Sequence, residues 1–419
     1  MRDEVMHMNI FVPDSVKNNA REVLLKNLAA TGGKYVCPSW PRYPHQWLWD
    51  SCFHAIALSR LELKDAAKNE IRRLFTFQQE NGFIPHIQYV SKRAQSPLAA
   101  ERFFYPHWKH HSSHTQPPVL ARALLAIQDP DFTREVFGKV KKFFLYFIEF
   151  QDPDRDGLIS NFIPTETGRD ATPEYDRFYP RLQGWGTTGR LFNMAAYFFF
   201  LSLTEAKYRL MGWDIARVSQ SRVDVEDLMF NSIWVDGMYV LSTLAESQDE
   251  KMELQGYAKR VEDAIIQKCW DEKSRTFWSL AKDNSFIKVM TVSNLFPLLL
   301  PRLPHGRAES IVNALRDPNK FWTPYPIPSV ARDEQVFDAD YREKLLWRGP
   351  TWVNTNWYLV IGLLRHGFTN EARELAERTV TMVEREGFRE FYQPFTGKGM
   401  RVKNFGWSTL AVTFDSLFT

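Results

Sequence analysis

The stretch VNTNWYLVIGLLRHGFTNEARELAERTVTMVERE, residues 353–386, decides the fold class of this chain. Its apolar residues recur at the spacing of an α-helix on both sides of Gly367, which predicts helices over residues 353–366 and 370–386. A glycine directly after a helix supplies the left-handed residue that ends it. We therefore expect the two helices to form a hairpin with a tight turn at residues 367–369.

Helical periodicity recurs from one end of the chain to the other. The other helices that it predicts are residues 15–30, 51–61, 65–80, 118–127, 133–150, 189–211, 223–233, 249–270 and 307–315. Signals for β-strands are few and short, such as residues 237–241. The chain is therefore expected to be all-α.

The connections between these helices alternate in kind. Short turns such as residues 61–64 contrast with long loops that are rich in Trp, Tyr, Pro and Gly. These long loops are residues 38–50, 103–117, 160–187, 321–351 and 388–406. A barrel of paired helices has tight turns at one end and functional loops at the other. We expect an (α/α)6 barrel, a toroid of six helical hairpins whose long loops form the active-site face, with residues 1–419 as a single domain.

The composition excludes several classes of protein. The 419 residues have a formal net charge of +3, whereas nucleic-acid-binding domains are usually strongly basic. Cys37, Cys52 and Cys269 are an odd set without CxxC spacing, which indicates free thiols in a reducing compartment. Residues 1–15 lack the apolar core of a signal peptide, and the longest apolar run, residues 194–203, is too short to span a bilayer. We expect a cytoplasmic monomer or homo-oligomer that binds neither nucleic acid nor membrane.

Aromatic residues are abundant, with 14 Trp, 15 Tyr and 32 Phe. A large core accounts for most of the Phe, because aromatic side chains bury much apolar area. Many of the Trp stand instead beside Gly, Pro, Asp and Arg in the long loops. Sugars present flat C–H faces with polar edges, so indoles flanked by carboxylates and amides favour a sugar-binding pocket.

Two of the long loops hold acidic residues in surroundings that suit acid–base chemistry. Residues 164–177 contain Glu166, Asp170, Glu174 and Asp176 between apolar flanks, and Glu390 stands among aromatic residues. A carboxylate in such surroundings tends to have its pKa raised by desolvation, which is common in acid–base catalysts. Acids in polar loops are otherwise solvated surface groups, so the residues alone leave each one a candidate.

Several loop segments resemble glycoside hydrolase family 63. The matching segments are YPHQWLWDSCFHA (residues 43–55), NGFIPH (81–86), HTQPPVLA (114–121), DGLISN followed by TETGRDATPEYD (156–176), LWRGPTWVNTNWY (346–358), EFYQPFTGKG (390–399) and FGWST (405–409). They follow the family's order across nearly the whole chain. The compact size resembles the bacterial mannosylglycerate and glucosylglycerate hydrolase branch.

That resemblance implies an α-glycosidase that hydrolyses a small sugar conjugate, mannosylglycerate or glucosylglycerate, with inversion and without metal or cofactor. Asp170 matches the family's general acid and Glu390 its general base. In inverting enzymes the two carboxyl groups are typically about 6.5–9.5 Å apart, which leaves room for a water molecule. The acid should hold its proton at neutral pH while the base stays ionised.

The resemblance also implies a pocket for the terminal sugar. The expected substrate-binding residues are Tyr43, Trp47, Trp49, Asp50, Gln116, Trp347, Arg348, Gly349, Tyr392 and Trp407. Asp50 has a structural alternative, since it could cap the helix that begins at Ser51. Trp352 is ambiguous, and Trp357 follows a helical pattern that favours the core.

Residues 396–404, TGKGMRVKN, follow the expected base and contain Lys398, Arg401 and Lys403. The two glycines and the positive charge suggest a mobile lid over an anionic aglycone such as glycerate, and an exposed, solvated loop is the alternative. A second feature bears on the sugar: Thr165 begins TETG, where many family members have WESG. This absence of an indole leaves glucose and mannose both open.

Other motifs favour structural roles. Asp152, Asp154, Asp156 and Gly157 match the first half of an EF-hand loop, but Ile163 stands where the loop needs a bidentate Glu, which favours a tight turn over calcium binding. The histidines His107, His110, His111 and His114 favour a polar loop over a metal site. Walker A and GxSxG patterns are missing from the sequence.

Three alternatives remain at this point. Two are enzymes on the same fold, namely a trehalase-like or oligosaccharide α-glucosidase and an inverting phosphorylase, which uses phosphate and does not need Glu390. The third is a carbohydrate-binding barrel without activity. In that case Asp170 and Glu390 would be far apart or held in salt bridges, instead of facing one pocket.

Overall fold

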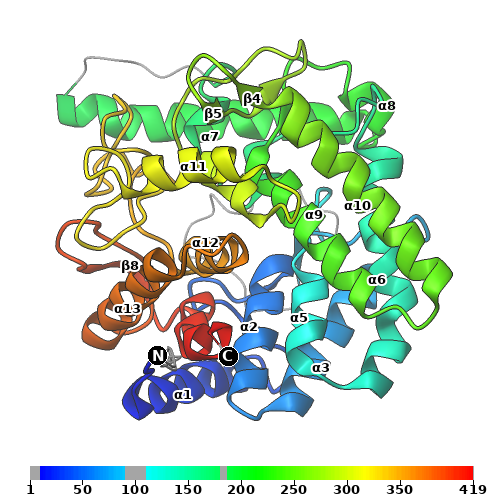
Figure 1. The fold of residues 1–419 in the computed structure, drawn as a ribbon, viewed down its shortest axis with the longest axis vertical. Coiled ribbons are helices and arrows are strands. Elements are labelled where there is room, and N and C mark those ends of the chain that lie inside the picture. The colour runs from blue at the N-terminus through cyan, green and yellow to red at the C-terminus, as the bar shows by residue number, and fades with distance from the viewer. Residues whose placement is uncertain (1–9, 90–109, 180–185, 419) are drawn as a thin grey trace, which may run out of the picture.

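The computed structural model describes residues 10–89, 110–179 and 186–418, with the side chains of 186–193 left out. Within these residues an inner ring of helical elements closes on itself, since each element packs against the next and the last packs against the first (Figure 1). In ring order these elements are α2 (Leu48–Arg60), α5 (Leu120–Ile127), α9 (Leu228–Thr243), the 3-10 helix η4 (Val292–Leu299), α12 (Val353–Arg365) and the 3-10 helix η5 (Gly406–Leu417).

An outer layer of helices covers this ring, and each outer helix packs against an inner neighbour. The outer helices are α1 (Asp14–Ala30), α3 (Lys64–Leu74), α6 (Pro130–Phe150), α10 (Gln248–Lys268), α11 (His305–Arg316) and α13 (Thr369–Glu386). In Figure 1 the blue α1 lies beside the red η5, which joins the two ends of the chain to one wall of the barrel. The expected all-α (α/α)6 barrel is confirmed.

The remaining elements lie in the long connections. The helical ones are η1 (Phe75–Phe77), η2 (Pro164–Thr167), η3 (Pro173–Tyr175), α7 (Gly186–Leu210) and α8 (Ile215–Val218). The strands form antiparallel pairs: β1 (Gln46–Trp47) with β2 (Ile87–Gln88), β3 (Val225–Glu226) with β6 (Leu280–Ala281), β4 (Trp270–Asp271) with β5 (Thr276–Phe277), and β7 (Arg389–Tyr392) with β8 (Gly399–Lys403).

The hairpin that decided the fold class forms as expected. Gly367 follows α12 with φ +81°, and the amide of Phe368 donates to the carbonyl of Leu363 at 2.9 Å. This left-handed turn reverses the chain, because glycine adopts positive φ without steric cost. The next helix, α13, then begins at Thr369 and packs back on α12.

Three expectations about secondary structure were wrong. The helix expected over residues 223–233 begins only at Leu228, because Val225 and Glu226 form β3. Residues 237–241 are not a strand but part of α9, which is buried around almost its whole circumference. A helix buried on every side has no polar stripe, so its apolar run cannot be distinguished from a strand by periodicity. The helix expected over residues 65–80 ends earlier: α3 stops at Leu74 and η1 continues it only to Phe77.

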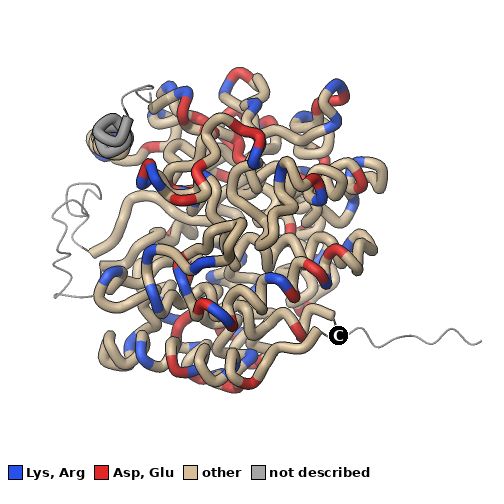
Figure 2. Tube along the Cα trace, turned by 90° about the vertical axis from the view of Figure 1, so that its left-hand side faces the viewer, with Lys and Arg blue, Asp and Glu red and all other residues tan. Residues whose placement is uncertain are grey.

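Many charged residues lie on the outside of the barrel (Figure 2). Figure 2 shows basic and acidic residues interspersed along the outer helices and loops, as expected for a net charge of +3. In the part of the chain that the structure describes, no helix combines the length and apolar character needed to cross a bilayer.

Candidate active site

Most of the residues expected at the site line one cavity of about 70 Å³. They are Tyr43, Trp47, Trp49, Asp50, Gln116, Asp170, Trp347, Glu390 and Trp407. The wall also contains residues that the sequence did not assign to the site: Pro38, His86, Gly168, Leu346, Trp352 and Phe405. Several of these lie inside the family-like segments, so the motifs were the signal that could have identified them.

Asp170 lies in the acid loop, which we define as residues 164–177, between η2 and η3. Burial raises the pKa of Asp170 to about 7, since the positive charge of Arg401 only partly opposes it and the negative charge of Glu390 adds to it. Its backbone carbonyl accepts a hydrogen bond from the Tyr197 hydroxyl at 3.2 Å. A carboxyl group with this pKa can hold a proton near neutral pH and donate it to a leaving group.

The acid loop is fixed by a buried ion-pair network. The guanidinium of Arg169 has no solvent exposure and contacts Glu174 at 2.8 Å and Asp227, which caps α9. Gly168 has φ +71°, and a β-carbon there would lie 2.6 Å from the indole of Trp49. The loop can therefore pack directly on the pocket wall only because position 168 is glycine.

Glu390 stands on β7 and is 3% exposed. Its Oε1 accepts a hydrogen bond from the Tyr43 hydroxyl at 3.0 Å and pairs with Arg401. Its Oε2 has no hydrogen-bond partner within the described residues. Burial raises the pKa of Glu390, while Arg401 and Tyr43 oppose this by stabilising the carboxylate. One oxygen is thus held and the other is available to a water molecule.

Within residues 396–404, Gly399–Lys403 form β8, which pairs with β7 as the second strand of a hairpin. Arg401 has φ +56°, and its guanidinium contacts both Glu390 and the Tyr43 hydroxyl. Lys398 and Lys403 are exposed. Of the three cations in this segment, Arg401 alone reaches the carboxylate.

Indole rings form one wall of the cavity. Trp347 and Trp352 stack with their ring centroids 3.8 Å apart and 5° between planes. Trp407 meets Trp49 edge to face at 5.4 Å, and its Nε1 donates to the backbone carbonyl of Glu390 at 3.1 Å. This wall offers flat faces to a sugar ring and also fixes the strand that holds Glu390. Trp357 packs in the core as expected, with its Nε1 bonded to Thr413.

Asp50 belongs to the cavity, and the helix-cap interpretation was wrong. Helix α2 begins at Leu48 with Trp47 as its N-cap, so Asp50 lies inside the first turn. Asp50 is 3% exposed, and burial raises the pKa of its carboxyl group well above the usual range, with Glu390 and Asp170 adding to the effect. Gln116 fixes the same turn, because its Oε1 accepts from the amide of Trp49 at 3.4 Å.

Three residues expected to bind substrate do not line the cavity. Arg348 is fully buried and forms a bidentate ion pair with Asp176 of the acid loop, with one contact at 2.6 Å. Gly349 donates its amide to Ser329 at 2.9 Å. Tyr392 is buried and donates its hydroxyl to the carbonyl of Gly387 at 2.7 Å. These residues connect the segments that carry the wall instead of facing the space inside it.

The motifs interpreted as structural also have defined places. Carboxylate oxygens of Asp152, Asp154 and Asp156 lie within 4.8 Å of one another. Asp152 accepts from the amide of Gly157, which is the tight turn expected there, and Lys268 pairs with Asp156 at 2.6 Å. His107 lies outside the described residues.

Other positions in these loops are also buried. His114 stacks on His86 at a centroid distance of 3.9 Å. Thr165 is 1% exposed and does not line the cavity. The position at which an indole was expected therefore makes no contribution to the described wall.

The chain is similar over most of its length to proteins of known activity. It is 29% identical to "Mannosylglycerate hydrolase" of Rubrobacter radiotolerans, covering 91% of this chain and 93% of the relative. It is 25% identical to "Glucosylglycerate hydrolase" of Mycolicibacterium hassiacum, covering 88% of this chain and 91% of the relative.

Solved structures show the same similarity. The GH63 mannosylglycerate hydrolase of Thermus thermophilus, in complex with Tris and D-glycerate, superposes with a TM-score of 0.83 at 28% identity, covering 95% of this chain and 99% of that one. The neutral trehalase Nth1 of Saccharomyces cerevisiae shares the fold alone, with a TM-score of 0.59 at 15% identity over 92% of this chain and 73% of that one.

Residues 43–408 match the family described as "Mannosylglycerate hydrolase MGH1-like glycoside hydrolase domain". This match includes every residue that lines the cavity except Pro38, and it contains both carboxylates. The chain therefore belongs to the MGH1-like glycoside hydrolase family and is a glycoside hydrolase.

Proposed function

We propose that this enzyme hydrolyses the α-glycosidic bond between a hexose and glycerate with inversion, with Asp170 as the general acid and Glu390 as the general base. The observation that supports it most is the pairing of two differently held carboxyl groups in one Trp-walled cavity. Burial raises the pKa of Asp170 to about 7, and Glu390 has one oxygen held by Tyr43 and Arg401 and the other without a partner among the described residues.

These two groups would divide the chemistry between them. Asp170 donates its proton to the glycosidic oxygen as the bond to the anomeric carbon breaks. Glu390, through Oε2, takes a proton from the water that attacks the opposite face of the sugar. Tyr43 and Arg401 keep Glu390 ionised, since both stabilise negative charge on Oε1.

We also propose that Arg401 selects an anionic aglycone. The Arg401 side chain is 20% exposed, and its guanidinium already contacts both Glu390 and Tyr43. A carboxylate on the aglycone would form charge-assisted hydrogen bonds with it, and these are among the strongest that proteins form. The relatives named for mannosylglycerate and glucosylglycerate support glycerate as this group.

We further propose that the enzyme works in the cytoplasm. Cys37, Cys52 and Cys269 are buried and unpaired, which suits a reducing compartment better than an oxidising one.

The test is sugar release from mannosylglycerate, glucosylglycerate, trehalose and kojibiose, with the anomer followed by NMR. We expect the β-anomer to form first from a glycosyl-glycerate, which indicates inversion. Glu390→Gln and Asp170→Asn should each reduce kcat at least about a hundredfold, the low end of the contribution of general acid–base catalysis. Retention of the α-anomer, or full hydrolysis by Glu390→Gln, would overturn the proposal. Phosphate-dependent turnover in Glu390→Gln would instead indicate a phosphorylase.

A further inference from the structure

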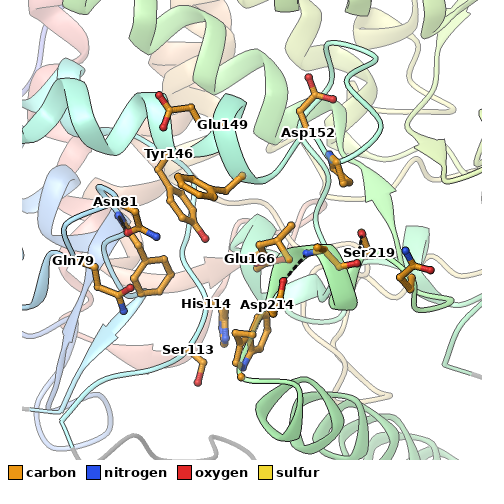
Figure 3. Close-up of a pocket in the computed structure, with 18 of the residues that line it drawn as sticks. Gln79, Asn81, Ser113, His114, Tyr146, Glu149, Asp152, Glu166, Asp214 and Ser219 are labelled. Carbon is orange, nitrogen blue, oxygen red and sulfur yellow. Dashed lines mark hydrogen bonds between the residues drawn. The ribbon is translucent and has the colours of Figure 1, made fainter.

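A second and larger cavity, of about 610 Å³, lies beside the acid loop. We call it the side cavity. It shares no lining residue with the active-site cavity. Its walls come from residues 79–83, residues 111–114, the end of α6 with residues 152–155, Glu166 of η2, and residues 212–220. Figure 3 shows Asn81, Tyr146, His114 and Asp214 arranged around a common space.

Two nitrogen atoms at this cavity have no hydrogen-bond partner among the described residues. They are Nε2 of His114, which is 4% exposed, and Nε1 of half-buried Trp213. The Oγ of Ser113 is likewise without a partner there. Burial lowers the pKa of His114 to about 3, so its imidazole is neutral. Buried polar groups usually have partners, so these atoms are available to hydrogen-bond a molecule in the cavity.

The signs of the groups narrow the ligand class. Glu149, Asp152 and Asp214 line the same cavity together with one cation, Arg155. The carboxylates outnumber the cation, so the wall disfavours an anion such as glycerate or phosphate. Trp213 Nε1 can only donate a hydrogen bond. Its hydrogen carries a partial positive charge, which disfavours a bare cation as the ligand. A hydroxyl group both donates and accepts, so it satisfies the carboxylates and the N–H donor together.

The apolar part of the wall is aromatic. Tyr146 and Phe150 stack at 5.4 Å with 27° between planes, and Phe83 meets Tyr146 edge to face at 5.5 Å. Flat aromatic surfaces with polar neighbours suit a ring that has C–H faces and hydroxyl edges. The volume is within the range of about 300–1,000 Å³ that small-molecule sites occupy.

We propose that the side cavity is a second, non-catalytic binding site for a neutral sugar or polyol. This site does not depend on the reaction proposed above. It lies directly behind the catalytic acid, because Glu166 faces the side cavity while Gly168 and Asp170 face the active site. The Glu166 carboxylate anchors this segment by accepting from Gln151 at 3.1 Å and from the amide of Phe162 at 2.6 Å.

The experiment measures the number of sugar sites on the full chain by calorimetry and ligand-observed NMR, with D-glucose and D-mannose as probes. We expect two sites for at least one of them in the wild type. Trp213→Phe, which keeps the ring and removes the N–H donor, should weaken one site about tenfold, the effect of one lost hydrogen bond. Ser113→Phe, which places a ring in the cavity, should abolish that site and leave the other.

Trp322→Phe is the matched control, because Trp322 is also half-buried but packs near Arg316 and Arg378, away from both cavities. Circular dichroism and an unchanged KM for hydrolysis verify that the variants fold. The proposal is overturned if neither probe binds at a site that Trp213→Phe weakens and Ser113→Phe removes. Hydrolysis is not the readout, so a failed reaction and a failed second site give different results.

Discussion

Replacement of Arg401 by glutamine tests how the enzyme recognises its aglycone. Arg401 pairs with Glu390 and with the Tyr43 hydroxyl, and its positive charge lowers the pKa of Asp170 and of Glu390. Glutamine keeps most of the length and polarity but removes the charge. The substitution should therefore change both the affinity for an anionic substrate and the pH dependence of the reaction.

The expected loss in binding follows from the bond that is removed. A hydrogen bond to a charged group is worth about 1.5–3 kcal/mol, so kcat/KM for a glycosyl-glycerate should fall by about one to two orders of magnitude. The corresponding glycosyl-glycerol lacks the carboxylate and should lose much less. Arg401→Lys should give an intermediate value, since it keeps the charge but not the planar fork.

The pH profile provides an independent measurement. Positive charge favours ionised carboxyl groups, so its removal raises the pKa of both Asp170 and Glu390. The acidic limb of kcat/KM, set by ionisation of Glu390, should move to higher pH. The basic limb, set by deprotonation of Asp170, should move up from about 7. Lys403→Gln is the control on the same strand and should change neither limb. Equal losses for the acidic and neutral substrates, with both limbs unmoved, would refute this reasoning.

Two further substitutions test the frame around the site. Gly168→Ala should lower the free energy of unfolding in urea by about 1–3 kcal/mol, because the new β-carbon would lie 2.6 Å from Trp49. Gly32→Ala is the control, since Gly32 also has a positive φ but a β-carbon there would have no atom within 4 Å. An equal loss in both variants would show that the clash is not the cause. For Asp236, burial raises the pKa, but Arg122 and Arg365 outweigh it and hold the pKa below the usual value. The contribution of Asp236 to folding stability is therefore fully present above its pKa in the unfolded chain. It is lost as the pH falls through the lower pKa of the folded protein. Asp236→Asn should have a lower free energy of unfolding at neutral pH, and that free energy should fall less steeply toward acid pH than in the wild type. An equally steep fall in the variant would contradict this role of Asp236.

The sequence contained enough information to place the barrel but not every member of its inner ring. Outer helices such as α13 have one buried and one exposed face, which periodicity detects. The inner elements η4 and η5 are buried almost throughout and are 3-10 helices, so their sequences lack the amphipathic periodicity of an α-helix. Gly237 within α9 is a second example. A β-carbon there would lie 2.7 Å from Phe144, and this close packing could not be predicted from the sequence around Gly237.

The role of Arg401 could not be predicted from spacing. Lys398, Arg401 and Lys403 are equivalent in the sequence, and only strand pairing distinguishes them. The register between β7 and β8 shifts between Arg389 and Phe391, directly at Glu390. Such irregularities bend a strand and redirect a side chain. With Arg401 in a left-handed conformation, the hairpin points this cation at the carboxylate while Lys403 stays exposed.

Burial alone does not distinguish the proposed acid, Asp170, from the proposed base, Glu390, since it raises the pKa of both. The difference arises from hydrogen-bond donors. Tyr43 and Arg401 contact Glu390 directly, whereas Arg401 acts on Asp170 only through its field. Because a carboxylate is stabilised more by donated hydrogen bonds than by a charge at longer range, Glu390 should ionise first. We therefore expect Arg401 to have two roles: it would keep the proposed base ionised in the free enzyme, and it would bind the negative charge of the aglycone.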